Sequence, residues 1–189
     1  MAQGKSKSLK TTSVPGGDLQ VSVRPVLFPG EDTQTYESLR DALLQDLAPQ
    51  TAYERVLVED LINLEWEKVR HRRLRDQLVL NSAREVAAHT FDPELASYLG
   101  FEHASPTARQ HAAAFVGPDT ALRRKAIAVL RDLDKDPAEI MALAYRAVGE
   151  AAAVHERKLA EIEGRRRKLM RDCQDLRASR ARVVASAAE

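Results

Sequence analysis

Apolar residues recur at three- and four-residue steps through most of this chain, the spacing that places them on one face of an α-helix. The first such run begins at Thr33 and ends where Ala48 meets Pro49, which predicts a short amphipathic helix. A capping-box sequence, Thr51 followed by Glu54, predicts that a longer helix starts next and reaches about Ala88. Its apolar face is wide enough for more than one partner, because it has two adjacent stripes: Leu57, Leu61 and Leu64, and Val58, Ile62, Trp66 and Val69.

Proline and glycine divide the neighbouring parts of the chain into short segments. Residues 19–23 alternate between apolar and polar, and we expect residues 1–31 to form a disordered or extended arm. The prolines at 93, 106 and 118 predict three short helices over about 93–99, 106–115 and 120–133. We expect these short helices to fold back as a compact cap.

The strongest helix start is Asp136-Pro137-Ala138-Glu139, which combines a cap residue, a proline at the first helical position and a carboxylate three residues after the cap. No proline follows it, so we expect one helix from Pro137 to about Ser186, roughly 75 Å long at about 1.5 Å per residue. Gly149 and Gly164 weaken this helix locally, by about 1 kcal/mol each. The sequence thus predicts an arm over 1–31, a helical core and cap over 32–136, and a long C-terminal helix over 137–189.

This last helix carries a heptad repeat, the pattern of helices that pair along a seam. One set of positions is Met141, Val148, His155, Ile162, Leu169, Leu176 and Val183, and the companion set is Tyr145, Ala152, Leu159, Arg166, Cys173 and Arg180. In a symmetric parallel dimer Arg166 and Arg180 would face their own copies, so like charges disfavour that pairing. A partner that carries acids suits these positions better.

An acidic partner exists within the chain. Residues 31–67 hold ten Asp/Glu against two Lys/Arg, a net charge of −8, whereas residues 165–182 hold eight Lys/Arg against two Asp, a net charge of +6. We therefore predict an all-α fold in which the helix from Thr51 and the helix from Pro137 form a long antiparallel, coiled-coil-like hairpin. In it, the acidic start of the first helix faces the region near residues 158–174. The acids expected to approach Arg165 to Lys168 and Arg171 are Glu54, Glu59, Asp60, Glu65 and Glu67. The residues predicted to pair the helices are Leu57, Leu61, Leu64, Leu159, Ile162, Leu169, Leu176 and Val183.

The pattern favours a non-enzymatic assembly or adaptor protein, whose long helix pairs with a second copy or with another helical protein. The alternative is a nucleic-acid-binding accessory protein of a phage or mobile element, in which cations neutralise the phosphates of DNA or RNA. No aromatic residue lies among the cations of residues 165–182 to stack on bases, which favours their pairing within the chain. The candidate nucleic-acid contacts are Lys5, Lys7, Lys10, Arg165, Arg166, Arg167, Lys168 and Arg171.

Common signatures of catalysis are absent from the sequence, which has no Gly-rich phosphate loop, nucleophile elbow or zinc-binding histidine pair. We therefore expect no enzyme activity, cofactor, metal site or small-molecule substrate. His155 and Cys173 fall on the seam, where packed roles are favoured over ligand or redox roles. A single cysteine allows no internal disulfide, and no run of about 20 apolar residues could span a bilayer, so we expect a cytoplasmic protein.

One part of the chain has a recognisable pattern. It comprises the run Phe28-Pro-Gly-Glu-Asp32, a helical segment that ends in Leu47-Ala-Pro49, and Trp66 followed by the arginines of residues 70–75. In these features residues 28–75 resemble a family of uncharacterised bacterial helical proteins often met in genomes rich in mobile elements. The resemblance implies a bacterial origin. Residues 1–17 do not have the basic, Gly- and Asn-rich composition of that family's leader, and no functional residue of the family carries over.

Overall fold

The computed structural model describes residues 25–92 and 104–187, and every regular element within them is an α-helix. The helices are α1 (Thr33–Leu47), α2 (Ala52–Phe91), α4 (Pro106–Val116), α5 (Thr120–Asp132), α6 (Pro137–Ala147) and α7 (Gly149–Ser186). The all-α class is thereby confirmed for these residues. The predicted arm up to residue 24 and the predicted helix over 93–99 lie outside the described residues.

Side-chain caps explain why the helices begin where they do. The carboxylate of Asp32 accepts hydrogen bonds from the backbone N–H groups of Gln34 and Thr35, which have no partner within the helix. Thr51 caps α2 by accepting from the N–H of Glu54. The Glu54 carboxylate does not return to Thr51, as the capping box predicts, but accepts from the N–H of Gln50 at 2.8 Å.

The predicted single helix from Pro137 to Ser186 is wrong at one point, because it is divided at Val148 into α6 and α7. Val148 has a ψ of 11°, which leaves the helical range, and Gly149 next to it is a poor helix former. On α6, the buried positions lie one residue before the heptad positions that the sequence predicts, Met141 and Tyr145. On α6 the buried residues are Ile140 and Ala144, whereas Tyr145, which belongs to the predicted repeat, is exposed.

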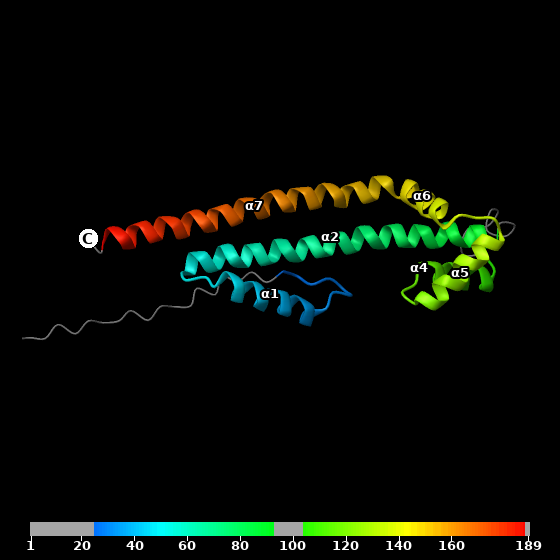
Figure 1. Cartoon of the computed structure of the whole chain (residues 1–189), viewed down its shortest axis with the longest axis horizontal. Coiled ribbons are helices and arrows are strands. Elements are labelled where there is room, and N and C mark those ends of the chain that lie inside the picture. Colours follow the sequence, from blue (N-terminus) through cyan, green and yellow to red (C-terminus); the bar gives the residue numbers. More distant parts are fainter. Residues whose placement is uncertain (1–24, 93–103, 188–189) are drawn as a thin grey trace, which may run out of the picture.

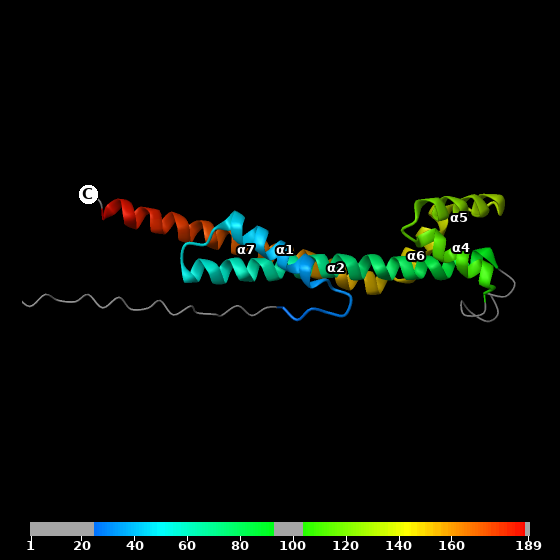
Figure 2. The ribbon, with the colours of Figure 1, turned by 90° about the horizontal axis from the view of Figure 1, so that it is seen from below.

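Helices α2 and α7 lie side by side and run in opposite directions over most of their lengths (Figures 1 and 2). Helix α1 packs beside the first half of α2. There Tyr36 meets Val58, Ile62 and Trp66 in a small core, and the rings of Tyr36 and Trp66 form an edge-to-face pair with centroids 5.3 Å apart. This core buries Val58, Ile62 and Trp66 of the second apolar stripe, so the two stripes face different helices, whereas Val69 of the same stripe is exposed.

A second core lies at the other end of α2, where α4, α5 and α6 gather (Figure 1). It is built mostly from alanines, which allow close approach of the helices, around the larger side chains of Phe115, Leu130 and Ile140. Residues 67–78 of α2 belong to neither core. None of the helices in the described residues combines the length and the apolar composition that a membrane span requires.

Candidate interaction surface on α7

The contact surface between α2 and α7, which we call the seam, follows a spacing of three and four residues on both helices. On α2 the positions at this spacing that are buried or contact α7 are Glu54, Leu57, Leu61, Leu64, Lys68, His71 and Arg75. Glu65, next to this set, also contacts α7 through Arg166. On α7 the matching set, all buried or half-buried, is Ala152, His155, Leu159, Ile162, Arg166, Leu169, Cys173 and Leu176. Ala153, Glu163 and Met170, beside this set, are half-buried too. Both sets alternate by three and four residues, which places each set on one face of its helix.

The predicted helix-pairing residues occupy different depths of this seam. Leu57, Leu61, Leu64 and Ile162 are buried, and Leu159, Leu169 and Leu176 are half-buried. Val183 differs, because its side chain is 66% exposed. The structure therefore brings seven of these residues to the buried or half-buried part of α2 and α7, and leaves Val183 in solvent.

Opposite charges meet along the seam at several levels. Arg166 on α7 forms an ion pair with Glu65 of α2, and the Lys68 ammonium lies 3.4 Å from the carboxylate of Glu163. Further along, Arg75 binds Glu156 at 2.8 Å. Each such pair is worth only about 0 to 1 kcal/mol where solvent reaches it, so the apolar contacts carry most of the stability.

Glu54 anchors the start of α2 to the distal part of α7. Its side chain is 1% exposed, and its two carboxylate oxygens lie 3.7 Å from the guanidinium groups of Arg177 and Arg180. Arg177 also donates a hydrogen bond to the backbone oxygen of Leu47, at the end of α1. The partners of Glu54 thus lie beyond the range 158–174 that the sequence predicts. Glu59 is also different, because it pairs with Arg40 of α1 at 2.7 Å instead of with α7.

The last turns of α7 project beyond the start of α2, which both views of the molecule show (Figures 1 and 2). Val183 and Val184 there are 66% and 64% exposed. The seam positions of α7 thus continue past the point where α2 begins. We call residues 177–187 the tip of α7; its charged residues are Arg177, Arg180 and Arg182.

The candidate nucleic-acid contacts divide into three groups. Arg166 is occupied by Glu65 and Glu163, and Arg167, although 72% exposed, lies 3.5 Å from Glu163. Arg165, Lys168 and Arg171 are exposed on the same stretch of α7. The remaining candidates, Lys5, Lys7 and Lys10, lie outside the described residues.

A cluster around Glu31 holds the segment before α1 against α2, and sequence reasoning missed it. The Glu31 carboxylate accepts hydrogen bonds from Arg70 at 2.6 and 2.9 Å, from the Trp66 indole at 3.3 Å and from the N–H of Phe28 at 2.8 Å. The Arg70 guanidinium lies 4.0 Å from the centre of the Phe28 ring. The guanidinium of Arg70, more than any other group, holds the pKa of Glu31 at about 2. Glu31 and Arg70 are 39 residues apart, and no local pattern connects them.

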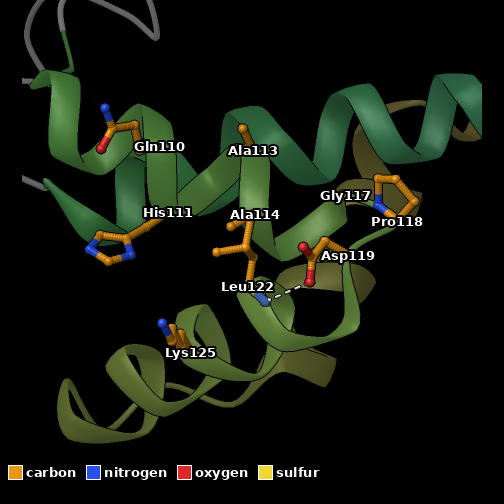
Figure 3. A pocket seen from close by; sticks show the side chains of 9 residues that line it. All are labelled: Gln110, His111, Ala113, Ala114, Gly117, Pro118, Asp119, Leu122 and Lys125. Atoms are coloured by element: carbon orange, nitrogen blue, oxygen red, sulfur yellow. Dashed lines mark hydrogen bonds between the residues drawn. The ribbon is translucent and has the colours of Figure 1, made fainter.

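An apolar cleft of about 530 Å³ lies between α4 and α5. His111 and Lys125 lie at one end of it and Gly117, Pro118 and Asp119 at the other, with Leu122 between them (Figure 3). The Asp119 carboxylate is already engaged, because it caps α5 by accepting from the N–H groups of Ala121 and Leu122. The cleft thus offers a mainly apolar surface whose one carboxylate is occupied in capping α5.

Cys173 is buried in the seam, and burial raises the pKa of its thiol, so it packs as a small apolar side chain. No cluster of three or more potential metal ligands occurs in residues 25–92 and 104–187. Comparison with protein-family models, with curated proteins and with solved structures found no match. The resemblance over residues 28–75 therefore stays a prediction, and the geometry of the seam and tip has to support any functional proposal.

Proposed function

We propose that this chain is a non-enzymatic adaptor or assembly protein whose α2 and α7 form an antiparallel coiled-coil hairpin, capped by α4 to α6, and whose α7 tip docks another helix. The observation that carries the proposal is the continuation of the seam beyond α2, with Val183 and Val184 exposed on the tip. An exposed apolar stripe that extends an existing helix interface is a suitable surface for a further helix.

Charge favours one kind of helical partner. The charged side chains of the tip, Arg177, Arg180 and Arg182, are all cationic, and the first two already face a carboxylate, that of Glu54. A second tip in the same place would bring like charges together, whereas an acidic amphipathic helix would complement them. We therefore favour a heterologous acidic helix over symmetric pairing of two tips.

A pull-down from the native host with nuclease treatment tests this proposal. The full chain is compared with Val183→Glu/Val184→Glu, which places two acids on the tip, and with Val154→Glu, a matched change at an exposed valine of α7 away from the tip. We expect a protein partner that survives nuclease and binds the Val154 variant but not the tip variant. A partner retained equally by both variants, or a strict monomer without any partner, would refute the assignment of the tip.

The second candidate function is binding of DNA or RNA through phosphate contacts. It is supported by the exposure of Arg165, Lys168 and Arg171 on one stretch of α7. Charge reversal of these three residues would weaken salt-sensitive binding to a duplex or single strand in an anisotropy titration. Unchanged binding, or none in the unmodified chain at low salt, would eliminate this candidate.

A further inference from the structure

Two histidines meet across the middle of the seam, where they join α2 to α7. The Nδ1 atoms of His71 and His155 are 2.9 Å apart, while the ring centres are 5.2 Å apart, so the two nitrogens face each other between the rings. This distance is that of a nitrogen–nitrogen hydrogen bond, which requires one Nδ1 to carry a proton and the other to accept it. A hydrogen bond at this contact therefore needs one Nδ1–H between the two rings.

Protonation of the two imidazoles decides whether the hydrogen bond between them can form. When both rings are neutral, one Nδ1–H donates to the other, and when one ring is an imidazolium it still donates to its neutral partner. When both are imidazolium, both Nδ1 atoms carry hydrogen and neither accepts. The second proton thus removes the hydrogen bond and adds a repulsion between two cations at the seam.

The charged neighbours of the pair come from both helices. On α2, Glu67 favours the charged form of His71, and Arg70 opposes it; on α7, Lys158 also opposes it. Lys68 and Arg75 flank His71 on the seam, and each is paired with an acid of α7, Glu163 and Glu156. Burial, followed by the neighbouring His155, lowers the pKa of His71 below its ordinary value of 6.5.

The position of the His71–His155 contact makes it important for holding the middle of α2 against α7. Residues 67–78 of α2 contribute to neither of the two cores. Apart from Arg70, which binds Glu31, the hydrogen bonds and ion pairs of this stretch with other described elements are made by seam side chains and reach α7. The apolar residues Leu57, Leu61 and Leu64 lie nearer the start of α2, and the alanine-rich core lies nearer its end. Loss of the histidine contact is therefore expected to open the middle of the seam while both ends stay packed.

We infer that the His71–His155 pair is an acid-sensitive contact that opens the middle of the α2–α7 seam when both imidazoles become protonated. Proton linkage gives the direction in which pH shifts the opening equilibrium. Because the closed state excludes the second proton, the open state binds more protons below about pH 6.5, and acid favours opening. The opening equilibrium should rise by up to about tenfold for each pH unit below that value.

Hydrogen–deuterium exchange of the full chain between pH 7.5 and 5, corrected for the intrinsic rate at each pH, measures this opening. We expect peptides over residues 68–78 and 150–159 to lose protection on acidification, while peptides over residues 57–66 and 160–176 lose much less. In His71→Leu/His155→Leu, apolar side chains occupy both seam positions and neither titrates. This variant should keep its protection in the middle of the seam at pH 5.

Two further variants keep the test decisive. His89→Gln/His111→Gln removes two histidines outside the pair and should leave the pH response of the seam unchanged. His155→Gln retains a polar side chain at the seam, so it provides a readout if the leucine variant does not fold, and it should weaken the pH response. The inference is overturned if unmodified protein loses protection equally in all four regions, or if the leucine or glutamine variant responds to pH as the unmodified chain does.

Discussion

Replacing Glu31 by Gln should remove a large share of the stability of the α1–α2 region. The pKa of Glu31 falls from an ordinary 4.5 to about 2, chiefly because Arg70 donates to its carboxylate. One pKa unit corresponds to about 1.4 kcal/mol, so the ionised carboxylate stabilises the folded state by about 3 kcal/mol at neutral pH. Its side chain is only 7% exposed, so water screens this interaction weakly. We expect Glu31→Gln to lower the free energy of unfolding by about 3 kcal/mol.

Urea denaturation followed by far-UV circular dichroism measures the effect without relying on Trp66, which is itself part of the cluster. A carboxylate with a depressed pKa stabilises the fold above its unfolded pKa and loses that contribution as pH falls through the range from 4.5 to about 2. The difference between the two proteins should therefore be full at pH 7 and shrink below pH 4.5. Glu85→Gln, the same change at an exposed position of α2, should stay within about 0.5 kcal/mol.

The reasoning is refuted if Glu31→Gln and Glu85→Gln unfold at the same urea concentration at pH 7. It is also refuted if the loss caused by Glu31→Gln is as large at pH 3 as at pH 7, because a cost that is independent of pH would not come from the ionised carboxylate.

Further predictions concern packing, backbone and charge. Ile62→Ala empties a fully buried position beside α1 and should cost about 2–5 kcal/mol in urea denaturation. Gly164→Ala should stabilise α7 by about 1 kcal/mol in thermal melts, because an added Cβ meets no atom within 4 Å; Gly117→Ala should destabilise, since its Cβ would lie 2.9 Å from the backbone oxygen of Ala113. A double-mutant cycle of Glu65→Ala and Arg166→Ala should give a coupling of about 0 to 1 kcal/mol.

Helix boundaries could be predicted closely where a cap residue precedes the helix. Asp32, Thr51, Asp119 and Asp136 each accept hydrogen bonds from N–H groups of the first turn, so the chemistry that ends the preceding loop is local and visible in sequence. The break at Val148 was not predictable in the same way. A lone glycine inside a helical pattern weakens a helix without specifying that it breaks.

Contacts between distant residues were only partly accessible from sequence. The three- and four-residue spacing identified which faces of α2 and α7 are apolar, because that periodicity is a property of each helix alone. The spacing does not fix the register between the two helices, so the partners of Glu54 fell outside the predicted range. The Glu31–Arg70 pair depends on how the segment before α1 crosses α2, which no periodicity describes.

The charged seam residues explain why one register is chosen over its neighbours. A slide of α7 by seven residues, one heptad, would keep the apolar pattern in phase, so apolar burial alone discriminates poorly between registers. Such a slide would move Arg166 from Glu65 to the level of Arg72 or of Val58, a like charge in the first case and an apolar position in the second. Both shifted registers lose the ion pair between Arg166 and Glu65. Arg166 would be repelled by Arg72 in the first register and would lose its hydration beside Val58 in the second. Weak individual ion pairs can therefore decide the register because the competing registers are penalised, even though each pair adds little to the total stability.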